Sequence, residues 1–203
     1  MYANSKPLRP GLWLLLSVLL SACSTPQPVP VSLYYHFPAP VEKGARAEKS
    51  SYSSILVRRP TASGIYNERS MLNVMADKPL EVNRYHYHFW SQYPSLMVQD
   101  NLVRFLTSSG VAEKVERKIN GRKADVIINS LIKRFEQVKN ASESFALVRI
   151  EFSVDIKGTR TSHEYEAKVK AGDTSIHSLA IAFGKALDAV MLELINKPLS
   201  TTQ

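Results

Sequence analysis

The sequence predicts an α/β fold, in which a mixed, largely antiparallel sheet carries two main helices; an α+β arrangement is the alternative. Residues 145–157 and 162–171 alternate apolar and polar side chains, as half-buried strands do. Two longer stretches, 91–110 and 174–196, repeat apolar residues at helical spacing. Each helical stretch follows a group of strand-like segments, so both helices have a sheet to cover.

Short strands are predicted at residues 55–58 and 71–75, on either side of a stretch that is rich in turn-forming residues. Residues 80–90 alternate two aromatic-rich sets and therefore predict a strand with both faces in use. The first helix follows, with Ser91 and Pro94 in its opening turn and Gly110 as its stop.

The sheet continues in residues 124–138, where the consecutive apolar residues Val126, Ile127 and Ile128 indicate a strand that is covered on both faces. Residues 145–157 predict a strand with one buried and one solvated face. A tight turn at 158–160 joins it to 162–171 as an antiparallel hairpin. The second helix, 174–196, closes the domain.

The first 22 residues have the pattern of a signal peptide, with Lys6 and Arg9 before an apolar run at 12–20 that is too short to span a bilayer. The sequence Leu-Ser-Ala-Cys at 20–23 matches the bacterial lipobox, in which small residues admit a peptidase and the thiol accepts diacylglycerol as a thioether. We therefore expect cleavage before Cys23. This residue then carries covalent diacylglyceryl and N-acyl lipid, an effectively stable membrane anchor, and no other cofactor is expected.

Three parts of the chain follow from this pattern: a signal peptide at 1–22, a lipidated, proline-rich tether at 23–54, and a single globular domain at 55–203. Within the tether, residues 33–37 are apolar enough for a short strand or docking segment. Ser24 permits transfer to the outer membrane, so the predicted location is its periplasmic face. Removal of the signal peptide with Lys6 and Arg9 lowers the net charge from +8 to +6, and this mild basicity suits anionic lipid or an acidic partner, but solvated lysines explain it more simply.

No catalytic motif is present: the chain lacks a phosphate-binding Gly-Lys-Ser/Thr loop and a Gly-x-Ser-x-Gly elbow, and its single cysteine is the lipidation site. We therefore predict that the protein is not an enzyme. His86 and His88 stand two apart on a predicted strand and could chelate a metal, but no third ligand is identifiable, so no metal site is predicted. Export also separates the chain from nucleic acid.

Aromatic residues are concentrated between positions 85 and 93. They could line a groove for an acyl chain or a partner peptide, or they could form the core between sheet and helix. We favour core packing for most of them. The expected exposed exceptions, and hence the predicted partner or ligand surface, are Tyr66, Tyr85 and Tyr87.

Several short motifs form a wider pattern. They are Tyr34-Tyr35, Ile-Leu-Val-Arg-Arg-Pro at 55–60, Tyr-Asn-Glu-Arg-Ser-Met at 66–71, and Tyr-His-Phe-Trp at 87–90 leading into Pro94, Gln99, Leu102 and Leu106. In these motifs the sequence resembles the ABC-type transport auxiliary lipoproteins, the family that includes paraquat-inducible protein C. The resemblance covers most of the chain after Cys23.

This resemblance implies a non-enzymatic accessory subunit of an ABC transport system with MCE (mammalian cell entry) domain proteins. Such systems move phospholipid or other hydrophobic material between membranes. The expected partners are the membrane, through the lipid anchor, and a periplasmic MCE-domain protein. The alternative is a freestanding envelope lipoprotein that binds a soluble ligand or supports envelope structure. The sequence leaves the oligomeric state open, a homo-oligomer included.

Overall fold

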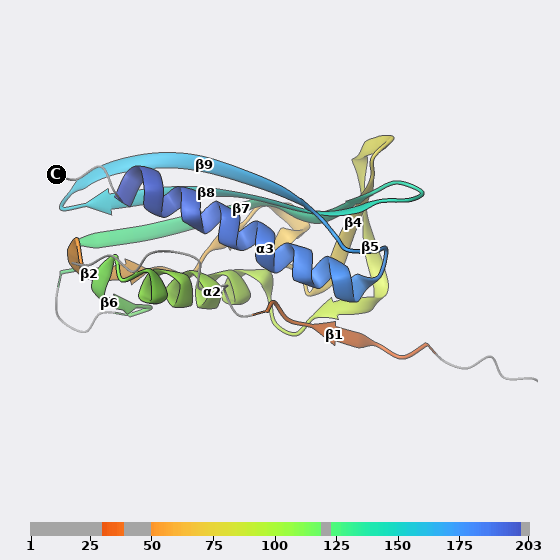
Figure 1. Cartoon of the computed structure of the whole chain (residues 1–203), viewed down its shortest axis with the longest axis horizontal. Helices are drawn as coiled ribbons and strands as arrows, with labels where there is room; N and C mark the ends of the chain where they lie inside the picture. Colours follow the sequence, from red (N-terminus) through yellow and green to blue (C-terminus); the bar gives the residue numbers. More distant parts are fainter. Residues whose placement is uncertain (1–29, 39–49, 119–122, 200–203) are drawn as a thin grey trace, which may run out of the picture. The chain divides into compact units, whose positions relative to one another are not determined.

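The sheet is organised around its longest strand, β7 (Val126–Lys139) (Figure 1). The computed structural model describes residues 30–38, 50–118 and 123–199. The predicted signal peptide and Cys23 lie outside these ranges. Residues Ser32–Gln203 group into one unit, and the fold described below is that of this unit.

The two edges of β7 are occupied differently. On one edge β8 (Ser144–Ile156) pairs antiparallel along almost the whole strand, and β9 (Thr159–Lys170) continues the hairpin. Three short strands share the other edge in chain order, all parallel to β7: β2 (Tyr52–Val57), β3 (Thr61–Ala62) and β4 (Ser70–Met75). The sheet is therefore mixed, and its longest ladders are antiparallel.

The short strands extend the sheet at opposite ends of β7. At the Val126 end, β6 (Ala112–Glu116) pairs parallel with β2. At the Lys139 end, β5 (Lys78–Trp90) pairs antiparallel with β4, and β1 (Leu33–Tyr35) pairs parallel with β5. Figure 1 shows the two groups at the two ends of the long strands.

Two helices cover the sheet. The first, α2 (Pro94–Ser109), packs beside β6 and against α3 (Ile176–Leu194), which lies along β8 and β9. Gly110 ends α2 because its φ of 69° is left-handed, a conformation that glycine adopts without strain. A single 3-10 turn, η1 (Gly64–Asn67), precedes β4, and a short π-helical turn, η2 (Ile195–Leu199), follows α3.

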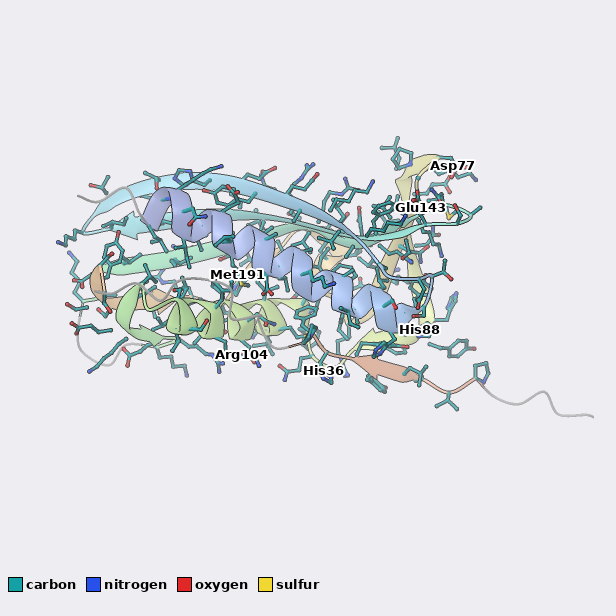
Figure 2. The ribbon with its side chains drawn as sticks, in the orientation of Figure 1. His36, Asp77, His88, Arg104, Glu143 and Met191 are labelled. Atoms are coloured by element: carbon teal, nitrogen blue, oxygen red, sulfur yellow. The ribbon has the colours of Figure 1, made fainter. Side chains whose placement is uncertain are left out.

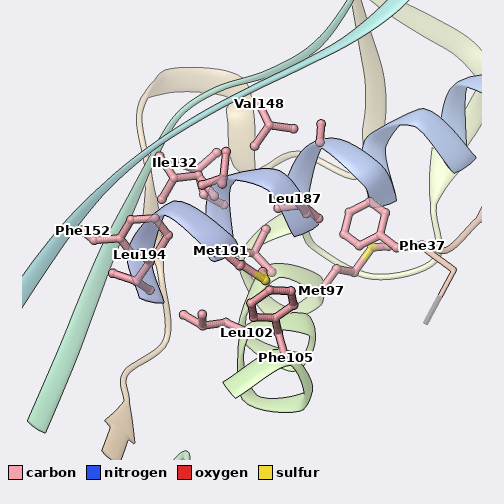
Figure 3. Packing of buried hydrophobic residues seen from close by; sticks show 14 of the residues in the cluster. Phe37, Met97, Leu102, Phe105, Ile132, Val148, Phe152, Leu187, Met191 and Leu194 are labelled. Atoms are coloured by element: carbon pink, nitrogen blue, oxygen red, sulfur yellow. The ribbon is translucent and has the colours of Figure 1, made fainter. Parts of the chain in front are cut away.

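The core lies between the helices and the sheet (Figure 3). Its apolar side chains come from α2, from α3 and from the inner faces of β7 and β8; examples are Leu102, Met191, Ile132 and Phe152. Four aromatic rings meet at its centre, with centroids 4.6–5.6 Å apart: Phe37, Trp90, Phe135 and Phe183. Such contacts add to the burial energy of the rings themselves.

The predicted fold class is confirmed, and so is the strand with one wet face. On β8, Val148, Ile150, Phe152 and Val154 are fully buried. The opposite face carries paired charges: Nζ of Lys133 lies 2.7 Å from Oε2 of Glu151 and 2.6 Å from Oε2 of Glu164. The hydrogen bond from Lys133 lowers the pKa of the Glu151 carboxyl.

Three sequence expectations differ from the structure. The folded unit begins before Ile55, where the sequence placed its start, because Phe37 and Tyr52 fill the core. The strand at 126–128 is fully covered on one face only, since Val126 and Ile128 are buried while Ile127 is partly exposed. Strand β6 had not been predicted, because Ala112–Glu116 contains just two apolar residues and alternates weakly.

Candidate functional site

The motif at residues 66–69 ties several elements together at one end of the sheet. The hydroxyl of Tyr66 donates a 2.6 Å hydrogen bond to Oε2 of Glu136 on β7. The next side chain, Asn67, accepts a 3.0 Å hydrogen bond at Oδ1 from the backbone N–H of Ser95. Ser95 lies in the first turn of α2, where backbone N–H groups have no partner within the helix. These two bonds hold η1 against both the central strand and the first helix.

The next two residues of the motif fasten strand β5. Glu68 accepts two hydrogen bonds from the guanidinium of Arg84, at 2.6 and 2.7 Å. Arg69 donates to the carbonyl oxygens of Trp90 and Ser91, at 3.2 and 3.1 Å. Four consecutive side chains thus link η1 to β7, α2, β5 and the turn between β5 and α2. A structural role therefore accounts for these four side chains.

The carboxylate that Tyr66 contacts is buried. Glu136 has no exposed surface, and Nε of Arg134 donates to its Oε1 at 2.7 Å while Tyr66 donates to Oε2. Burial and the hydrogen bond to Glu136 raise the pKa of Tyr66 to about 12. The charge on a buried carboxylate is tolerated when it is paired and hydrogen-bonded, as it is here.

The three tyrosines that the sequence singled out lie in different surroundings. Tyr66 and Tyr85 are half-buried, and the Tyr85 hydroxyl donates to Oε1 of Gln137 at 2.6 Å and accepts from Nζ of Lys139 at 3.1 Å. Tyr87 is 44% exposed. The structure brings Tyr85 and Tyr87 together on β5, with Tyr66 on η1. Their role as a partner or ligand surface stays a prediction.

The histidine pair of β5 is divided between two environments. His88 is labelled in Figure 2. Its Nδ1 lies 3.1 Å from the hydroxyl oxygen of Tyr35, and its ring meets that of Tyr85 edge-on at 5.4 Å. His86 is exposed, with its ring 6.4 Å from that of Tyr87. Within residues 30–38, 50–118 and 123–199, no three histidine, cysteine or acidic side chains gather in a way that would hold a metal ion.

Strand β5 bows away from its neighbour and creates a hollow. Its ladder with β4 passes from the pair Ser70 and Phe89 directly to the pair Leu72 and Arg84, so residues 85–88 stand opposite Met71 alone. This irregularity is a special bulge, with four residues opposite one, and a bulge bends its strand. A hollow of about 490 Å³ lies there, and its lining includes Val82, Arg84, Tyr85, His86 and Phe89.

A family model for the ABC-type transport auxiliary lipoprotein component matches residues 35–194. The chain belongs to the ABC-type transport auxiliary lipoprotein family. The resemblance drawn from its motifs is thereby confirmed, and the match spans the folded unit from β1 to the last residue of α3. This auxiliary lipoprotein is an accessory component of transport in the cell envelope.

Two solved structures share the fold of the auxiliary lipoprotein. Protein XCC0632 from Xanthomonas campestris, a DUF330 protein, has a TM-score of 0.71 and 23% identity over 83% of this chain and 96% of that one. A second crystal structure, of an uncharacterized protein, has a TM-score of 0.68 and 11% identity over 83% and 99%. A comparison with curated protein sequences finds no match. No helix within the described ranges is long and apolar enough to cross a membrane.

The residues that connect the elements at this end of the sheet were not predicted from the sequence. Glu136 stands between Phe135 and Gln137 on a strand, and its charge suggests a solvated position although its carboxylate is buried. Asn67 looks like an ordinary turn residue, yet it caps a helix that starts 27 positions later. The available signal was the run of four hydrogen-bonding side chains at 66–69 in a stretch predicted as a turn.

Proposed function

We propose that this auxiliary lipoprotein is the non-enzymatic outer-membrane subunit of an ABC transport system that contains an MCE-domain protein. It would dock the periplasmic MCE partner and help to complete a path for phospholipid or another hydrophobic substrate. The family match over residues 35–194 carries this proposal. The lipobox ending at Cys23 supports the anchor, and Ser24 supports the outer membrane as its destination.

The polar residues of the fold support a role in binding over one in catalysis. The most deeply buried charge, Glu136, is bonded to Arg134 and Tyr66, and these bonds join β7 to η1. The histidines of β5 contact tyrosine rings. Residues that connect elements in this way build a stable docking domain.

The anchor can be tested apart from the partner. Cells are labelled with an alkyne fatty acid, and wild type is compared with Cys23→Ser after density separation of inner and outer membranes. We expect label on the wild-type chain alone, in the outer-membrane fraction. Unlabelled wild type would contradict the lipid anchor, and label confined to the inner membrane would contradict the proposed location.

The partner is tested by affinity capture from detergent-solubilised envelopes with a tag after Gln203. The proposal predicts that MCE-domain and ABC components are enriched over a capture with an unrelated tagged outer-membrane lipoprotein. Repeated capture without any such component would favour the freestanding lipoprotein, which binds a soluble ligand or supports the envelope.

A further inference from the structure

Exposed apolar side chains concentrate on β1 and β5. Five large hydrophobic residues there are well exposed, among them Leu80 at 95% and Tyr34 at 59%; the others are Leu33, Val82 and Tyr87. Elsewhere within the described ranges 32–38, 50–118 and 123–199, Tyr93, Ile181 and Leu192 are exposed singly. We call the five residues the β1–β5 edge. Exposed apolar side chains that gather on two paired strands are typical of an interaction site.

We propose that the β1–β5 edge lies on the phospholipid surface to which the chain is anchored. One argument rests on the proposed lipid at Cys23, because it uses the length of chain between this anchor and β1. Leu33 follows Cys23 by ten positions, and a chain of that length spans at most about 36 Å. β1 is the first strand of the described residues, so its residue Leu33 stays within that distance of the lipid.

The position of the β1–β5 edge in the fold also supports contact with the phospholipid surface. β4 meets the Lys139 end of β7, whereas β2 meets the Val126 end. β5 and β1 extend the sheet from β4, so both strands of the edge belong to the Lys139 end of β7 (Figure 1). With a rise of about 3.3 Å per residue, the opposite end of β7 lies roughly 40 Å further along the strand.

Charge distinguishes a bilayer from a charged protein partner. Arg84 is bonded to Glu68, Nζ of Lys78 lies 3.9 Å from Oε2 of Glu81, and the guanidinium of Arg69 lies 5.2 Å from the centroid of the Tyr34 ring. The cations around the edge are thus engaged within the fold. Tyrosine and leucine beside balanced charges suit the boundary between head groups and acyl chains, where tyrosine is enriched in membrane proteins.

The test places a fluorescent reporter on the edge and a matched one elsewhere. Cys23 is the single cysteine of the chain, so residues 23–203 can be coupled through its thiol to a maleimide lipid. The vesicles contain phosphatidylethanolamine, phosphatidylglycerol and a dibrominated phosphatidylcholine. Leu80→Trp and Tyr87→Trp report on the edge, and Leu192→Trp on α3 is the control, with 42% exposure. Trp90 is 1% exposed and gives the same background in all variants.

We expect brominated lipid to quench the tryptophan emission of Leu80→Trp and Tyr87→Trp more strongly than that of Leu192→Trp. Quenching that is equal at all three positions, or absent from all of them, would overturn the proposal. Because the chain is anchored chemically, the result does not depend on lipidation in cells. The experiment therefore tests membrane contact of the β1–β5 edge separately from lipidation of Cys23. Leu80 is almost fully exposed, so its substitution leaves the fold intact.

Discussion

The hydroxyl oxygen of Tyr66 lies 2.6 Å from Oε2 of Glu136, and this carboxylate has no exposed surface. The bond joins the 3-10 turn η1 to the central strand β7. Tyr66 opens the motif at residues 66–71, which carries part of the family resemblance, and in the fold it connects two elements of structure.

Replacing Tyr66 with phenylalanine should therefore destabilise the chain without changing its fold. A hydrogen bond to a charged group contributes about 1.5 to 3 kcal/mol, and its loss leaves one oxygen of a buried carboxylate without its donor. Chemical denaturation measures the loss in the free energy of unfolding. Tyr93→Phe is the control, because Tyr93 is 49% exposed and should change stability little. Equal stability of the two variants would contradict this account.

The same bond predicts a stability change in alkali. The folded chain holds the pKa of Tyr66 at about 12, above its ordinary value of 10.0, through burial and the bond to Glu136. A raised pKa stabilises the folded state fully below pH 10, and that contribution is lost as the pH rises toward 12. The stability gap between wild type and Tyr66→Phe should narrow across this window. A gap that is constant with pH would show that Tyr66 titrates normally.

Asn67 should stabilise helix α2 from outside the helix. Tyr93, the N-cap residue, makes no side-chain capping bond, and Asn67 supplies an acceptor to the backbone N–H of Ser95. Asn67→Ala should cost about 1 kcal/mol, the usual contribution of a capping side chain. Asn67→Asp keeps the acceptor and should retain most of the stability. Hydrogen exchange in the first turn of α2 reports the effect locally, and unchanged exchange in Asn67→Ala would refute the capping role.

The segment after β1 should be packed tightly against α3. A Cβ atom added at Gly184 would lie 2.6 Å from Cγ and 2.8 Å from Cδ of Pro38. Gly184→Ala should therefore destabilise wild type by about 1 to 3 kcal/mol. In a Pro38→Ala background the same change should stabilise by up to about 1 kcal/mol, because alanine favours helix more than glycine does. The same sign in both backgrounds would contradict the close approach.

The parts of the fold with strict periodicity could be predicted from the sequence. Strand β8 alternates regularly from Val148 onward, β9 continues the alternation, and α2 and α3 have clear apolar stripes and stop signals. The N-terminal boundary could not be predicted, because the seven residues between Pro30 and Pro38 carry no periodicity that reveals Phe37 as a core residue. The joint of Tyr66 and Glu136 was equally hidden, since 70 positions separate the two residues and only the folded sheet brings them together.

We expect this chain to serve an ABC transport system with an MCE-domain protein, and genetic epistasis in the native organism tests that expectation. Outer-membrane phospholipid asymmetry is measured after deletion of the gene for this chain, of the MCE gene, and of both. If the two proteins act in one system, all three strains should lose phospholipid asymmetry to the same extent. The wild-type gene should rescue the strain that lacks this chain, and Cys23→Ser should not. Defects that add in the double deletion would contradict it.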